Sequence, residues 1–155
     1  MSDGSLVYLD TNAFRDLVES DPATSTPMQT LFQILRKRPG LGSTSELTLA
    51  EILAPSSKGR KRPAHLKRTY MDLLLWGEFL TLHPVSRAVI METVELRATR
   101  TTAKLKLPDA IHLATAILSG CSLFVSRDHD IPMPAGMRRV EVTAASLADV
   151  LEALG

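Results

Sequence analysis

The chain has 155 residues, of which 45% are hydrophobic and 23% are charged, and its formal net charge at pH 7 is +1. This length suits a single domain spanning residues 1–155, and this composition excludes an intrinsically disordered chain. The near-neutral charge excludes binding to nucleic acid through overall charge, so any such preference must be local.

Short apolar runs bounded by turn residues predict five strands, at residues 6–9, 41–43, 79–84, 123–125 and 138–143. A first helix is expected at residues 12–19 with Asn12 as its cap, and a second runs from a loop bracketed by Pro22 and Pro27 to about residue 38. Five further helices are expected at residues 45–53, 65–79, 86–100, 108–119 and 144–154. Helices between successive strands favour a three-layer α/β/α fold around a mostly parallel sheet, with the last strand at its edge.

The lone cysteine, Cys121, excludes an internal disulfide and indicates a reducing compartment. The start, MSDGSL, lacks a basic region followed by an apolar run, so we expect no signal peptide. No apolar stretch approaches the roughly 20 residues of a membrane-spanning helix. We therefore expect a cytoplasmic protein that does not associate with membranes.

Two acids follow predicted strands at their carboxyl ends. Asp10 comes directly after the strand at residues 6–9, and Asp128 lies three residues beyond the strand at 123–125. Ligands of open parallel sheets bind in the crevice beyond the carboxyl ends of the strands. Two more acids, Glu51 and Asp109, lie near the starts of helices, and we expect all four to share this crevice.

Each acid also has a purely structural explanation. Thr48 and Glu51 form a capping-box pattern, Asp109 suits the first turn of a helix, Asp128 suits a turn, and Asp10 could cap a helix. Four acids in one crevice repel each other, and a bound divalent cation removes that cost. Oxygen ligands without pairs of His or Cys favour Mg²⁺ or Mn²⁺ over Zn²⁺. Water bound to such a metal can act as the nucleophile in phosphodiester hydrolysis.

Four segments, in this order, resemble the motifs of PIN-domain ribonucleases, and most of all those of the VapC-type toxins of bacterial toxin–antitoxin pairs. "VYLDTNAF" resembles the first motif, "STSELTLAEIL" the second, and "LPDAIHLATAILSGCSLFVSRDHDI" the third and fourth joined. The resemblance covers nearly the whole chain. It implies a PIN-like three-layer α/β/α fold with about five strands and a Mg²⁺- or Mn²⁺-dependent endoribonuclease.

The resemblance also assigns roles to individual residues. Asp10, Glu51, Asp109 and Asp128 match the catalytic acids and would hold the metal directly or through water. A metal-activated water would attack the phosphorus in line and leave a 5′-phosphate and a 3′-hydroxyl. Supporting roles would fall to three further residues that orient carboxylates or substrate or add a further acid: Asn12, Ser126 (more often Thr in the family) and Asp130.

The resemblance further implies partners besides the RNA substrate. Such toxins commonly form homodimers, so we expect one here. They are silenced by a small antitoxin whose tail lies along the acidic groove, where Arg or Lys of that tail would pair with the carboxylates. We therefore expect a cognate antitoxin.

Two acid-free stretches carry many cations. The denser, "KGRKRPAHLKR", has six Lys or Arg and follows the Glu51 helix, and the second, at residues 97–106, precedes Asp109. RNA is a polyanion, so we interpret both as a basic rim around the acidic crevice, against the alternative of an ordinary solvated surface. The candidate RNA-binding residues are Lys58, Arg60, Lys61, Arg62, Arg97 and Arg100, and Lys104 and Lys106 belong to the same second stretch.

Other functions fit the sequence less well. A non-catalytic PIN-like domain that binds a partner has no need for four mutually repelling acids. A phosphatase of the haloacid-dehalogenase kind requires Asp at the position of Asn12, and "DTNAF" lacks the glycine-rich turn of a dinucleotide site. His112, three residues after Asp109, is better explained as a hydrogen-bonded core histidine than as a general base.

Overall fold

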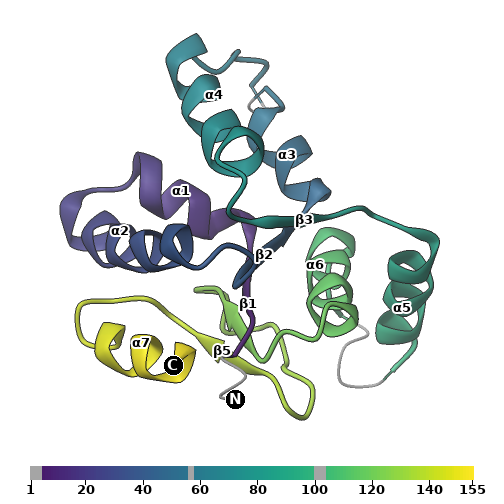
Figure 1. Cartoon of the computed structure of the whole chain (residues 1–155). Coiled ribbons are helices and arrows are strands. Elements are labelled where there is room, and N and C mark those ends of the chain that lie inside the picture. The colour runs from purple at the N-terminus through teal and green to yellow at the C-terminus, as the bar shows by residue number, and fades with distance from the viewer. Residues whose placement is uncertain (1–4, 56–57, 100–103) are drawn as a thin grey trace.

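The computed structural model describes residues 5–55, 58–99 and 104–155, and these ranges contain five strands and seven α-helices (Figure 1). The strands are β1 (Val7–Leu9), β2 (Gly42–Ser45), β3 (Thr81–His83), β4 (Leu123–Val125) and β5 (Arg138–Val140). The α-helices are α1 (Thr11–Glu19), α2 (Pro22–Lys37), α3 (Glu46–Leu53), α4 (Ala64–Met71), α5 (Arg87–Ala98), α6 (Leu107–Leu118) and α7 (Leu147–Leu154). A π-helical turn, η1 (Asp72–Trp76), continues α4. No helix of these ranges is long and apolar enough to cross a membrane.

The five strands form one sheet in the order β3-β2-β1-β4-β5, and every neighbouring pair is parallel. The chain builds outward from β1 through β2 to β3, then returns to the other side of β1 for β4 and β5. This reversal puts a topological switch point between β1 and β4, where open parallel sheets bind their ligands. The predicted mostly parallel sheet of about five strands, with the last strand at an edge, is confirmed.

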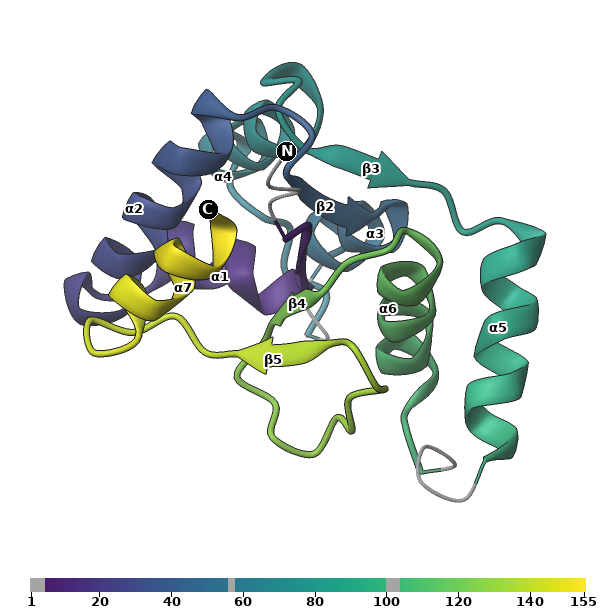
Figure 2. The same cartoon turned by 60° about the horizontal axis from the view of Figure 1, so that its bottom comes forward.

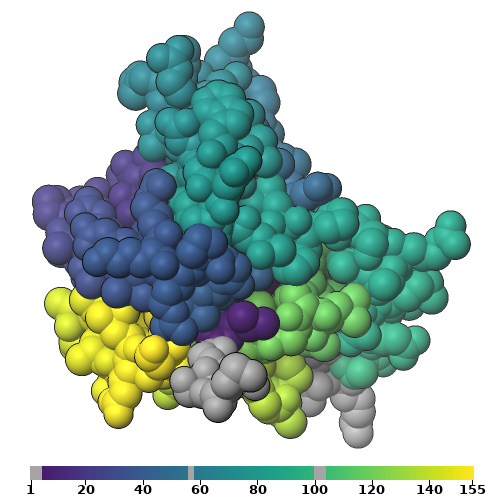
Figure 3. Space-filling model, in the orientation of Figure 1, coloured from purple at the N-terminus to yellow at the C-terminus, as the bar shows by residue number. Residues whose placement is uncertain are grey.

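Helices cover both faces of the sheet, which confirms the predicted three-layer α/β/α fold. Helices α1, α2 and α7 lie on one face, and α6, with α5 outside it, lies on the other (Figures 1 and 2). On the side seen in Figure 3, α2 lies between α4 and α7. The alternation of side chains along β1 explains both cores, since Val7 and Leu9 pack with Phe14 of α1 whereas Tyr8 packs with Phe124 and α6.

The predicted cap of the first helix is wrong by two residues. Asp10, not Asn12, is the N-cap of α1, and its Oδ1 accepts a hydrogen bond from the Ala13 amide at 3.1 Å. Asn12 lies exposed in the first turn and cannot reach the orphan amides that a cap satisfies. Asp10 therefore does have the capping role that its position in the sequence allowed.

Two other boundaries differ from the prediction. The expected loop between Pro22 and Pro27 is the first part of α2, because Asp21 caps the helix and Pro22 at its start requires no amide partner. Pro27 lies inside the helix, where buried neighbours such as Met28 and Leu31 hold the turn in place. The helix predicted at residues 65–79 ends as α4 at Met71 and continues only as the π-helical turn.

Candidate active site

The four predicted acids lie around the carboxyl edge of the sheet. Asp10 follows β1, Asp128 follows the neighbouring strand β4, Asp109 is in the first turn of α6, and Glu51 is in α3. Asp109 and Asp128 line a cavity of about 490 Å³, together with Asp130. The cavity thus contains two of the four predicted acids, whereas Asp10 and Glu51 are not among its lining residues.

Asp10 does not line this cavity and is only 8% exposed. Burial raises the pKa of its carboxyl group above the usual 3.8, while a hydrogen bond with the Ser126 hydroxyl and one from the Ala13 amide act in the opposite direction. Desolvation disfavours the charged form of a carboxylate, and hydrogen bonds to the ionised oxygens restore part of the loss. Asp10 is thus a buried acid with a limited set of donors, whose charge a cation would stabilise.

Ser126 connects two of the acids. Its Oγ accepts a hydrogen bond from the Asp128 amide at 3.0 Å, and its hydroxyl also bonds Asp10. The Asp128 side chain is fixed in turn, because its Oδ1 accepts from the Asp130 amide at 3.0 Å. Asp128 therefore has the turn role considered from the sequence, and this same turn holds its carboxylate at the cavity.

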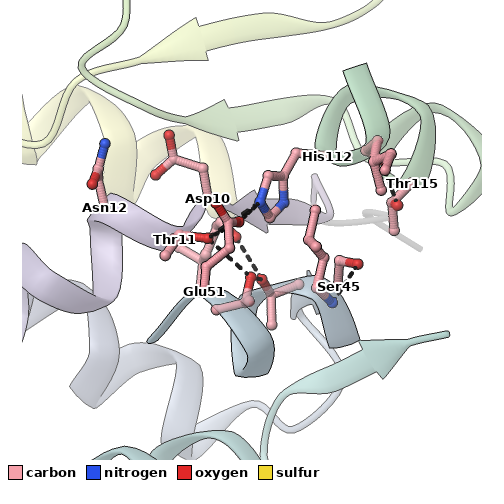
Figure 4. A network of polar contacts seen from close by, with 12 residues as sticks. Asp10, Thr11, Asn12, Ser45, Glu51, His112 and Thr115 are labelled. Atoms are coloured by element: carbon pink, nitrogen blue, oxygen red, sulfur yellow. Dashed lines mark hydrogen bonds and ion pairs between the residues drawn. The ribbon is translucent and has the colours of Figure 1, made fainter. Parts of the chain in front are cut away.

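Glu51 is not part of a capping box, because α3 begins at Glu46 and its N-cap is Ser45, whose Oγ accepts from the Leu47 amide. The Glu51 side chain instead bonds two residues from other helices (Figure 4). Its Oε1 accepts from Thr11 Oγ1 at 2.8 Å and lies 2.6 Å from Nε2 of His112. The structural explanation for Glu51 therefore fails, and its side chain belongs to the network around the site.

The two half-buried acids, Glu51 and Asp109, differ in their pKa shifts. Burial raises the pKa of Glu51, but the hydrogen bonds from His112 and Thr11 outweigh it, so the pKa lies below the usual 4.5. The pKa of Asp109 lies above the usual 3.8, because burial raises it and the charges of Asp128 and Glu51 add to this effect. Three acids therefore lie close enough to influence one another, which is the mutual repulsion expected of a cation site.

His112 is a buried, hydrogen-bonded histidine, as the sequence indicated, but its partners were not foreseen. It is 4% exposed, and its two ring nitrogens lie 2.6 Å from Tyr8 Oη and from Glu51 Oε1. Thr11 and His112 are thus the site residues that sequence reasoning missed. The only sequence feature that pointed to Thr11 was its hydroxyl next to Asp10. The only feature that pointed to His112 was its position three residues after Asp109 on the same helix.

The chemistry of these side chains fits a hydrated Mg²⁺ or Mn²⁺. In the described part of the chain, no group of three or more His, Cys, Asp or Glu side chains is placed so that it could hold a metal ion by itself. Mg²⁺ does not require such a group, since it keeps several waters and binds through one or two carboxylates and substrate phosphates. Carboxylates that repel one another beside an open cavity are donors of this kind.

The remaining predicted residues are distributed unevenly. Asn12 accepts a hydrogen bond from Arg15 at 3.3 Å, and Asp130 is exposed at the cavity.

The predicted basic residues do not lie together. Arg62 forms an ion pair with Glu19 at 3.3 Å, and Arg97 lines a separate small cavity on α5. Lys58, Arg60 and Lys61 are exposed in the loop before α4, and Arg100 lies outside the described residues. Lys104 and Lys106, in contrast, line the acidic cavity itself.

Comparison with known proteins agrees with this architecture. The family model of the PIN domain matches residues 7–136. Among solved structures, a toxin–antitoxin complex from Klebsiella pneumoniae is similar at a TM-score of 0.59, with 28% identity over 85% of this chain and 95% of that one. VapBC2 from Rickettsia felis, bound to a DNA fragment from its promoter, gives a TM-score of 0.66, with 17% identity over 88% and 98% of the two chains.

A third similar structure is VapC20 from Mycobacterium tuberculosis, described as a toxin that cleaves the sarcin–ricin loop. It gives a TM-score of 0.62, with 15% identity over 80% of this chain and 91% of that one. No curated protein matches significantly. The matched residues contain the four acids, Ser126 and the sheet up to β4, and the fold is that of VapC-type toxins, so this chain belongs to the PIN domain family.

Proposed function

We propose that this protein is an endoribonuclease that hydrolyses RNA phosphodiester bonds with Mg²⁺ or Mn²⁺, and that it is the toxin of a toxin–antitoxin pair. The observation that carries the proposal is the cavity lined by Asp109 and Asp128. The charges of Asp128 and Glu51 raise the pKa of Asp109, and Asp10 ends the strand next to the one that Asp128 follows. Membership of the PIN domain family supports the same activity.

In this proposal the four acids hold the metal, directly or through water. When bound, a divalent cation supplies a water of lowered pKa and neutralises charge on the phosphate. Ser126 orients Asp10 and Asp128 at the same time, because its hydroxyl bonds one and accepts from the amide of the other. Lys104 and Lys106, which line the same cavity, would bind the RNA backbone, which the acids alone would repel.

The experiment that tests the activity is cleavage of total cellular RNA by the purified protein with Mn²⁺. Asp10→Asn and an EDTA control accompany the wild type, and Asp149→Asn, on the exposed surface of α7, is the matched control variant. Discrete products from the wild type and Asp149→Asn, absent with EDTA and with Asp10→Asn, are expected. Equal products from wild type and Asp10→Asn would contradict the proposal and favour a non-catalytic, partner-binding PIN domain.

We also propose a cognate antitoxin, a homodimer and a cytoplasmic location. Two of the similar structures are toxin–antitoxin assemblies, and an acidic cavity suits an Arg- or Lys-bearing segment of a partner. The RNA substrate proposed here supports the cytoplasmic location. Sedimentation of the purified protein at several concentrations tests the dimer, which predicts twice the mass of 16.9 kDa.

A further inference from the structure

Four elements of the fold meet at one buried imidazole. His112, on α6, has Nδ1 2.6 Å from the hydroxyl of Tyr8 on β1 and Nε2 2.6 Å from Oε1 of Glu51 on α3. Thr11, at the start of α1, donates its hydroxyl to the same Oε1 at 2.8 Å. Figure 4 shows His112, Thr11 and Glu51 gathered in one network of polar contacts.

The direction of these hydrogen bonds follows from Tyr8. Its side chain is fully buried, and a phenol, whose ordinary pKa is about 10, keeps its proton at neutral pH. When the imidazole is neutral, that proton is donated to Nδ1, which leaves the ring hydrogen on Nε2, facing Glu51. Oε1 of Glu51 therefore receives two donors, and within the described residues every hydrogen bond to its carboxylate ends on Oε1.

This arrangement exceeds what packing requires. A leucine would fill a buried position on α6 without any hydrogen bond, whereas each nitrogen of His112 has a side-chain partner more than 60 residues away in the sequence. Buried polar groups are costly unless every member of the network is satisfied. A satisfied network that ends on the carboxylate of a candidate metal ligand indicates that the orientation of this carboxylate is its purpose.

We propose that His112, oriented by Tyr8, is a positioning residue that fixes Oε1 of Glu51 and thereby leaves the second carboxylate oxygen for the hydrated metal. The inference rests on the proposed function, because the metal is part of it. Residues that hydrogen-bond metal ligands without touching the metal typically contribute about 10- to 100-fold to metal affinity or activity. His112 makes no contact with substrate in this scheme and acts through Glu51.

The test measures binding of Mn²⁺ alone by isothermal titration calorimetry, with RNA cleavage as a second readout. His112→Leu is expected to weaken Mn²⁺ binding by about tenfold or more. His112→Gln places an N–H donor near the position of Nε2 and should recover most of that loss. Tyr8→Phe, which removes only the hydroxyl, should give an intermediate effect.

The matched control is His83→Leu on β3. His83 is a half-buried histidine that bonds Ser43 and not an acid, so this variant should bind Mn²⁺ as the wild type does.

A double variant separates positioning from general loss of structure. In a Glu51→Gln background, Tyr8→Phe should have no further effect on Mn²⁺ binding, since the hydroxyl acts only through Glu51. An equal loss in both backgrounds, or wild-type affinity in a folded His112→Leu variant, would overturn the inference. These outcomes overturn the inference alone, because the wild type still binds Mn²⁺ and cleaves RNA. A wild-type protein that does neither would overturn the proposed function as well.

Discussion

Arg127 reaches from the loop after β4 to Asp16 on α1, where its Nη2 lies 2.6 Å from Oδ1. Asp16 is 6% exposed and Arg127 lies between Ser126 and Asp128 in the sequence. The ion pair therefore ties the loop that carries two candidate site residues to the helix that Asp10 begins. Nothing in the sequence suggested this contact, because the two residues are separated by 111 positions.

Arg127→Ala should destabilise the protein by about 1–2 kcal/mol, because it leaves the buried Asp16 carboxylate without its cation. The loss is smaller than for a fully buried pair, since the Arg127 side chain is 56% exposed. Burial raises the pKa of Asp16, so its charge is already costly, and Asp16→Asn in the Arg127→Ala background should restore part of the stability. Urea denaturation measures both; a change below about 0.5 kcal/mol for Arg127→Ala would contradict the prediction.

Asp109→Asn should raise the thermal stability of the metal-free protein at pH 7. The pKa of Asp109 in the folded protein lies above 3.8, because of burial and the charges of Asp128 and Glu51. The folded state therefore binds this proton more tightly than the unfolded state, and stability falls as pH rises from 3.8 through the folded pKa. Melting curves in EDTA should show the gain, and added Mn²⁺ should stabilise the wild type more than the variant. A lower melting temperature for Asp109→Asn in EDTA would count against this account.

Ser126→Ala should shift the acidic limb of the pH–activity profile to higher pH. The Ser126 hydroxyl lowers the pKa of Asp10, so its removal raises that pKa further, and Asp10 must be ionised to hold a cation. The rate at neutral pH should fall by about tenfold, as for other groups that orient metal ligands. Ser126→Thr keeps the hydroxyl and should keep the profile of the wild type. If the acidic limb of the pH–activity profile does not shift in a folded Ser126→Ala variant, Ser126 does not stabilise the charge of Asp10.

Lys104→Gln combined with Lys106→Gln should weaken RNA binding and flatten its salt dependence. Both side chains line the acidic cavity, and removing one cation that neutralises a phosphate lowers the slope of log K against log salt by about 0.7 for single-stranded RNA. Binding is best measured by fluorescence anisotropy in the Asp10→Asn background, where RNA is not cleaved. Lys58→Gln with Lys61→Gln tests the other predicted stretch in the same way, and a larger effect from that pair would move the RNA path to the loop before α4.

Arg62→Ala should act on stability and not on RNA. Arg62 was predicted to bind RNA with its neighbours, but its guanidinium lies 3.3 Å from Glu19 at the end of α1. An exposed or half-exposed ion pair of this kind contributes up to about 1 kcal/mol. Denaturation and anisotropy measured on the same sample distinguish the two roles, and weaker RNA binding at unchanged stability would restore the RNA-binding interpretation of Arg62.

Local patterns in the sequence were sufficient for most of the fold. The strand at residues 123–125 and the start of the helix predicted at residues 86–100 lie where the structure has β4 and α5, whose N-cap is Ser86, because apolar runs and capping residues act within a few positions. Pro27 was misplaced because tertiary packing of α2 outweighs the local preference of proline. The capping box predicted for Thr48 and Glu51 is wrong, because the N-cap of α3 is Ser45, three residues before Thr48.

The acids themselves could be located from the sequence, but their environment could not. Position after a strand is a local property, so Asp10 and Asp128 were found from the order of elements. The hydrogen bonds of Glu51 join residues 40 and 61 positions apart, and those of His112 extend to 104 positions. Such contacts depend on how four elements pack against one another, and no local pattern in a single sequence predicts this packing.

The central position of β1 has a consequence for biosynthesis. β1 is made before the other four described strands, yet its neighbour β4 lies more than 110 residues later, and Ser126 and Asp128 follow β4. A chain still being translated thus carries Asp10, Glu51 and Asp109 without the strand that completes the switch point. A premature stop before β4 therefore leaves a chain that lacks Ser126 and Asp128, so the candidate site can assemble only after β4 has been made.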